Sequence, residues 1–238
     1  MMINLNGRFS FDWGHLSYMD YDISNSFIAI RKLNSNQEYS LSESKKELEE
    51  KIASIKDYNK DGEEEFIETY IHHLTHDDEI MIDEIQRLQR YSIVMSIFAF
   101  YEGQLKSVCT LIEEEFDFKI KIKDLNNYKG DLVKYWTYLD KVYGMETHAL
   151  KSLFDPLIIQ KKIRNIIVHH DGIVTQKIAS ELPKTDGISF KKSGEFLILQ
   201  IEETIYLELL LSSIEVFFKE LHKEIDKKYT KLNHIKKS

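Results

Sequence analysis

The chain has 238 residues, of which 42% are apolar and 30% are charged, and its formal net charge is −8. This composition is ordinary for a soluble protein with one good-sized core or two small ones, so the chain is expected to fold alone. The acidic balance argues against a general nucleic-acid binder, because affinity for phosphate comes largely from clustered Lys and Arg. It does not exclude a local basic groove.

Little in the sequence interrupts regular structure, since there are only two prolines and nine glycines. An all-α fold built from long helices is therefore expected. Cys109 is the only cysteine, which excludes an intramolecular disulfide, and its apolar neighbours predict a buried side chain. No apolar stretch approaches the roughly 18 residues of a membrane span, and the first residues do not resemble a signal peptide. We therefore expect a soluble, cytoplasmic protein that does not contact a membrane.

The first third of the chain predicts an arm, a helix and a turn. Residues 1–36 show no clear helical period and are interpreted as a packed N-terminal arm with a candidate short strand at 27–30. Residues 42–55 begin with a capping box and predict a helix, and residues 57–62 predict a turn. The expected domains are accordingly 1–62, an arm and helix, and 63–238, a helical domain.

Residues 63–115 are nearly all helix formers, with a break or kink expected near 75–78. The apolar surface broadens in the second half, which should lie at the centre of the bundle. Glu102 is an acid among apolar residues there, and an unpaired buried charge is costly. Two outcomes stay open for Glu102, namely exposure at the rim and an ion pair with Arg164.

Three further elements are predicted after residue 130, one before and two after residues 156–170. Residues 131–143 predict an aromatic-rich helix whose stripe is interpreted as core, with base stacking in single-stranded RNA as the alternative. Residues 188–191 and 195–201 flank a glycine and predict a small β-hairpin. An amphipathic helix is predicted from about residue 202 to residue 229.

The segment whose side chains best suit a chemical reaction is RNIIVH, residues 164–169. Asp155-Pro156 before it is a helix-start signal and Asp171-Gly172 after it is a helix stop, which predicts a helix over 156–170. At about 100° per residue, the polar and cationic side chains share one broad face, and three isoleucines with His170 lie opposite. His170 is therefore expected to be a core or interface histidine. The polar face comprises Lys161, Lys162, Arg164, Asn165 and His169, and the apolar face comprises Ile163, Ile166, Ile167 and His170.

The polar face carries groups suited to RNA cleavage. An imidazole with an ordinary pKa of about 6.5 can transfer protons at neutral pH, and a guanidinium can neutralise charge on a phosphate without losing its proton. The candidate catalytic residues are Arg164, Asn165 and His169. Lys161 and Lys162 are candidate substrate-binding residues, and His170 and Glu102 are candidate supporting residues.

An arginine, a polar residue, three further positions and a histidine at the end of a helix resemble the R-x4–6-H motif of HEPN domains. The resemblance implies a helical bundle with long antiparallel helices, here with a small β-hairpin insertion near 188–201. It further implies a homodimer in which two motifs face each other, and metal-independent endoribonuclease activity of a toxin or anti-phage defence type, without a cofactor. An antitoxin or another defence protein would be an additional partner.

One residue departs from the pattern of HEPN toxins that are paired with nucleotidyltransferase antitoxins. In those toxins a tyrosine two residues beyond the histidine receives nucleotides, whereas this chain has Asp171 there. The departure argues against regulation by that modification and leaves the cleavage residues unaffected.

Other functions stay open. The chain can be a HEPN-like module that binds RNA, a nucleotide or a protein without cutting, or a helical interaction protein in which the motif is accidental. A separate cluster contains Glu68, His72 and His76, which are spaced to ligate a divalent metal on one helix. Because the HExxH motif and a second ligand set are missing, no metal site is expected.

Overall fold

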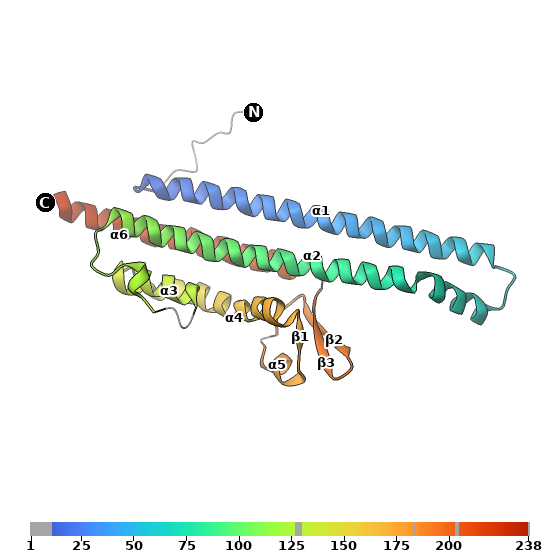
Figure 1. Ribbon diagram of the computed structural model, residues 1–238. Coiled ribbons are helices and arrows are strands. Elements are labelled where there is room, and N and C mark those ends of the chain that lie inside the picture. The colour runs from blue at the N-terminus through green and yellow to red at the C-terminus, as the bar shows by residue number, and fades with distance from the viewer. Residues whose placement is uncertain (1–10, 127–129, 183, 203–204, 238) are drawn as a thin grey trace, which may run out of the picture. The chain divides into compact units, whose positions relative to one another are not determined.

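The computed structural model describes residues 11–126, 130–182, 184–202 and 205–237, with side chains as far as Asn233. Most of the described chain is helical, and a small antiparallel sheet precedes the last helix (Figure 1). The expected helical class with a small β insertion is confirmed. The first ten residues of the expected arm lie outside the described residues.

The elements follow one another with short connections. The two longest helices come first, and the sheet with its short helix separates α4 from α6. In chain order they are α1 (Gly14–Tyr58), α2 (Glu64–Glu115), a 3-10 turn (Ile122–Asp124), α3 (Asp131–Thr137), a π-helical turn (Tyr138–Val142), α4 (His148–His170), β1 (Ile173–Val174), α5 (Gln176–Glu181), β2 (Ile188–Ser193), β3 (Phe196–Ile201) and α6 (Ile205–Lys237).

Two expectations about the long helices are wrong. Residues 14–36 are helical rather than an arm with a strand, and the buried side chains of Leu16, Ile23 and Phe27 follow a helical spacing. Of the break or kink expected near residues 75–78, the break is absent, because α2 is continuous from Glu64 to Glu115. Thr75 does not cap a new helix. Its hydroxyl lies 2.9 Å from the carbonyl oxygen of Ile71 and bonds back to the preceding turn of the same helix.

Residues 30–93 form one compact unit, called here the hairpin unit, in which parts of α1 and α2 run antiparallel (Figure 1). The guanidinium of Arg90 donates to both carboxylate oxygens of Glu38, at 2.8 and 2.9 Å. Lys51 pairs with Asp78 at 2.6 Å nearer the tip. The expected boundary at residue 62 falls in the turn of this hairpin, so the compact units divide the chain differently from 1–62 and 63–238.

The second compact unit, called the bundle unit, contains the described residues of 1–29 and 94–238. Aromatic rings join its helices. The Phe217 ring of α6 lies 5.6 Å from Tyr101 of α2 and 6.0 Å from Phe154 of α4. Trp136 of α3 stacks on Phe154 at 4.2 Å. Four helices therefore meet at one aromatic cluster, defined by Tyr101, Trp136, Phe154 and Phe217.

The aromatic stripe of residues 131–143 is core, as interpreted from the sequence. Tyr135, Tyr138 and Tyr143 are buried, and burial raises the pKa of Tyr138 to about 12. The structure differs from the single predicted helix, because α3 gives way to a π-helical turn at Tyr138. Cys109 is buried as predicted, and desolvation raises the pKa of its thiol.

The predicted β-hairpin is confirmed and gains one strand. β2 and β3 pair antiparallel around Gly194, whose φ of 60° suits glycine, and β1 pairs with the other side of β3. β1 has only two residues, too few to show a strand pattern in the sequence. The amide of Leu199 donates to the carbonyl of Gly172 at 2.9 Å, which ties the sheet to the end of α4.

Across the described residues, we find no helix with both the length and the apolar character required to cross a membrane.

The Glu38–Arg90 pair yields a test of the hairpin unit. Replacing Glu38 by Ala removes this carboxylate from Arg90, whose side chain is only 9% exposed. We therefore expect the free energy of unfolding to fall by about 1–3 kcal/mol. Glu50→Ala is the control, because its pair with Lys46 is exposed and should change stability by less than about 0.5 kcal/mol. Urea unfolding followed by circular dichroism measures both. Equal stability of the two variants would contradict the assigned role of the pair.

Candidate functional site

Helix α4 carries the RNIIVH segment and is longer than predicted. It begins at His148, eight residues before the predicted start at residue 156, so Pro156 lies inside the helix. Proline removes one helical hydrogen bond, which would join it to the carbonyl of Ser152. Both Ser152 and Pro156 are exposed, so that carbonyl can be hydrated instead.

The end of α4 agrees with the prediction. The helix stops at His170, and Asp171 adopts the left-handed conformation with φ of 50° and ψ of 35°. The backbone amides of Asp171 and Gly172 both donate to the carbonyl of Ile166, which caps the last turn. The conformation of the chain directly after the motif is thereby fixed.

The inner face of α4 is set by apolar packing. Ile163, Ile166 and Ile167 are buried, as the helical count predicts. Arg164 and Asn165 are partly buried beside them, and His169 is exposed.

The structure joins two of the three candidate catalytic residues directly. Nη1 of Arg164 donates to Oδ1 of Asn165 at 3.2 Å. Within the described chain, His169 forms no hydrogen bond with either residue, although Asn165 lies one helical turn before it. The imidazole of His169 is thus exposed to solvent, and only Arg164 and Asn165 are joined by a hydrogen bond.

Two alternatives considered for the supporting residues do not hold. His170 is exposed in the single chain rather than packed with the isoleucines, because α4 ends at this residue and the chain turns away at Asp171, so it is not a core histidine, and its place in an interface stays a prediction. Glu102 pairs with Lys161 at 2.5 Å, not with Arg164, and both side chains are largely buried. Lys161 is therefore neutralised within the fold, whereas Lys162 is exposed and available to an anion.

Arg164 differs from Arg87 and Arg90 in its environment. Its Nε is buried and has no hydrogen-bond partner among the described residues, and none of their carboxylates pairs with the guanidinium. Arg87 and Arg90, by contrast, each pair with a glutamate. Nε of Arg164 is closed off from solvent, but the rest of the side chain is only partly buried, so the uncompensated charge of the guanidinium is available to an anionic ligand.

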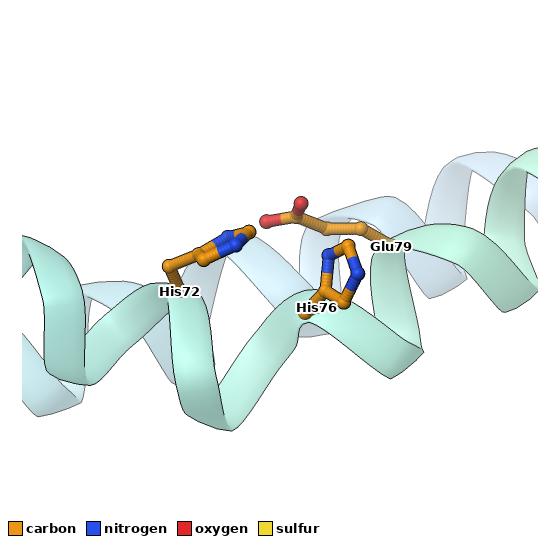
Figure 2. A group of neighbouring side chains, drawn as sticks. All are labelled: His72, His76 and Glu79. Atoms are coloured by element: carbon orange, nitrogen blue, oxygen red, sulfur yellow. The ribbon is translucent and has the colours of Figure 1, made fainter. Parts of the chain in front are cut away.

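A second group of chemically active side chains lies in the hairpin unit. Figure 2 shows His72, His76 and Glu79 of α2 gathered on one side of the helix, with potential ligand atoms all within 4.8 Å of one another. The acid expected beside these histidines from the sequence is Glu68, whereas in the structure it is Glu79. The missed signal is the spacing of four and three residues in H-x3-H-x2-E, which also keeps three side chains on one helix face.

Comparison of the chain with protein-family models, with curated proteins and with solved structures finds no match. The assignment of function therefore depends on the residues described above.

The neighbouring lysines of α4 separate a structural role from a binding role. Lys161→Ala would leave the largely buried carboxylate of Glu102 without its partner, and we expect the free energy of unfolding to fall by about 1–3 kcal/mol. Lys162→Ala removes an exposed lysine and should change stability by less than about 0.5 kcal/mol. Chemical unfolding of both variants is the measurement, and a larger effect at Lys162 would contradict the structure.

Proposed function

We propose that the chain is a metal-independent endoribonuclease of the HEPN type, with Arg164, Asn165 and His169 as its catalytic residues. The observation that carries the proposal is the partly buried guanidinium of Arg164, which has no carboxylate partner among the described residues, in the last two turns of a helix that also carries the exposed imidazole of His169. A phosphodiester is an anion that a guanidinium binds well, and its cleavage requires proton transfer near neutral pH.

In the proposed reaction the ribose 2′-oxygen attacks the adjacent phosphorus. An imidazole accepts the 2′-hydroxyl proton, the bond from phosphorus to the 5′-oxygen breaks, and a second acid protonates the leaving oxygen. The products are a 2′,3′-cyclic phosphate and a 5′-hydroxyl. Arg164 would stabilise the charge on the pentacoordinate phosphorus, where a preorganised donor contributes about 3–4 kcal/mol. Asn165, which already accepts from Arg164, would hold the guanidinium in place.

The helix geometry supports a site shared by two chains. Arg164 and His169 are five residues apart, so their side chains leave the helix about 140° apart. Two copies of α4 facing each other would bring the arginine of one chain near the histidine of the other, and would supply two imidazoles on opposite sides of one phosphate. We therefore propose a homodimer with a composite active site.

The distribution of charge is consistent with a selective enzyme. The net charge of −8 disfavours indiscriminate RNA binding, while Lys162 and Arg164 provide local positive charge on α4. A role in a toxin or anti-phage defence system, with a protein that restrains the activity, follows from the resemblance to HEPN domains.

Cleavage of RNA in the presence of EDTA is the direct test. A labelled single-stranded RNA of mixed sequence should be cut by the full-length protein, and mass spectrometry should find 2′,3′-cyclic phosphate ends. His169→Ala should lower kcat/KM by about 100- to 10,000-fold, because it removes the proton-transfer group. Arg164→Ala should lower it by about 100- to 1,000-fold.

His148→Ala is the matched control, because His148 is an exposed histidine at the other end of α4 and should leave the rate unchanged. Undiminished cleavage by a folded His169→Ala variant would refute the catalytic assignment. Binding of the RNA without any cleavage by the wild-type protein would instead support a non-catalytic binding module.

The shared site makes a separate prediction, because the structure exposes His170 beside His169. If the second imidazole comes from another chain, dilution should lower the specific activity in proportion to the fraction of dimer. Light scattering measures that fraction. His170→Ala should then retain activity within about threefold, as for an exposed residue outside the reaction. The alternative is that both imidazoles belong to one chain. Specific activity would then stay constant at protein concentrations where the chain is monomeric, and His170→Ala would lose activity.

A further inference from the structure

We infer that His72, His76 and Glu79 form a binding site for a divalent transition metal, with Zn²⁺ as the expected ion. The site lies on α2 in the hairpin unit and is separate from the residues proposed to cleave RNA. Two imidazoles and one carboxylate are a ligand set that zinc accepts in proteins, and hard ions such as Mg²⁺ prefer oxygen ligands alone.

The spacing of the three residues aims them at one point. Positions 72, 76 and 79 fall within an arc of about 60° around a helix. Side chains of a helix lean toward its N-terminus, so the carboxylate of Glu79 leans back toward the histidines that precede it. Figure 2 shows this arrangement, with the carboxylate of Glu79 reaching over His76 toward His72.

The distances permit coordination after small side-chain rotations. The potential ligand atoms lie within 4.8 Å of one another, whereas ligands of a tetrahedral zinc ion are about 3.3 Å apart, given bonds of about 2.0–2.1 Å. All three side chains are exposed, so they can rotate without displacing packed neighbours. The imidazole rings already lie close together, with ring centroids 4.7 Å apart and ring planes inclined by 57°.

A neighbouring side chain supports the carboxylate ligand. The buried hydroxyl of Thr75 lies 3.2 Å from Oε1 of Glu79 and 2.9 Å from the carbonyl of Ile71, so its one proton can go to either oxygen. Hydrogen bonds from such outer partners orient metal ligands. Thr75 thus acts as a positioning residue for Glu79 and does not itself bind the ion.

The charge of the surrounding segment favours a cation. Residues 64–84 contain eight Asp or Glu residues and no Lys or Arg. Two of the acids are paired, Asp78 with Lys51 of α1 and Glu84 with Arg87 of α2. The excess negative charge lowers the energy of a bound divalent ion and repels polyanions. With three protein ligands, the ion keeps a coordination position for water.

Zinc binding to the full-length protein without an affinity tag tests the inference. Protein stripped with a chelator and dialysed should bind one Zn²⁺ per chain in titration calorimetry, and a tenfold excess of Mg²⁺ should not compete. His72→Ala and His76→Ala should each weaken binding by about 100-fold or more, and Thr75→Val by about tenfold, the range seen for outer partners.

His73→Ala is the matched control, because His73 is an exposed histidine of the same helix outside the cluster and should change affinity by less than about twofold. X-ray absorption of the zinc complex should show nitrogen and oxygen ligands, with the imidazole contribution lost in a His72→Ala, His76→Ala double variant. Absence of stoichiometric binding by the wild-type protein, or unchanged affinity in the double variant, would overturn the inference. Either result leaves the RNA cleavage proposal to its own test, which is run in EDTA.

Discussion

The aromatic cluster around Phe217 is the constraint on which the candidate cleavage site depends. Each large ring removes about 150–250 Å² from water, so a cluster that joins four helices is a strong restraint on their rotation. Phe154 places α4 in this cluster through its contacts with Trp136 and Phe217. With Phe154 and the isoleucines facing inward, packing leaves Lys162 and His169 exposed on the other side of α4.

Ion pairs decide which cations of α4 can meet a ligand. Lys161 is adjacent to Lys162 in sequence, but the fold uses it to neutralise Glu102. Arg164 donates only to the neutral amide of Asn165 among the described residues, and so keeps its charge uncompensated by them. Excess negative charge is concentrated instead on α2 between residues 64 and 84, in the other compact unit. A chain that is acidic as a whole can therefore still offer a cationic surface.

Local signals predicted the features that depend on neighbouring residues. The stop at Asp171-Gly172, the buried isoleucines of α4 and the hairpin around Gly194 each follow from helix capping, periodicity or turn chemistry within a few residues. The errors concern features that tertiary contacts decide. Pro156 reads as a helix start, yet the apolar residues that precede it, Leu150 and Phe154, are buried in the core and extend α4 toward His148. The partner of Glu102 lies 59 residues away, a pairing that spacing alone cannot reveal.

The order of the strands has a consequence for the behaviour of the protein at high concentration. β2 is an edge strand of the three-stranded sheet, and an exposed edge strand can pair with a strand of another molecule and start aggregation. Its second half carries Lys191 and Lys192, both exposed. These two positive charges repel the same edge strand of a second molecule. The small sheet can thereby support the end of α4 without becoming a seed for fibrils.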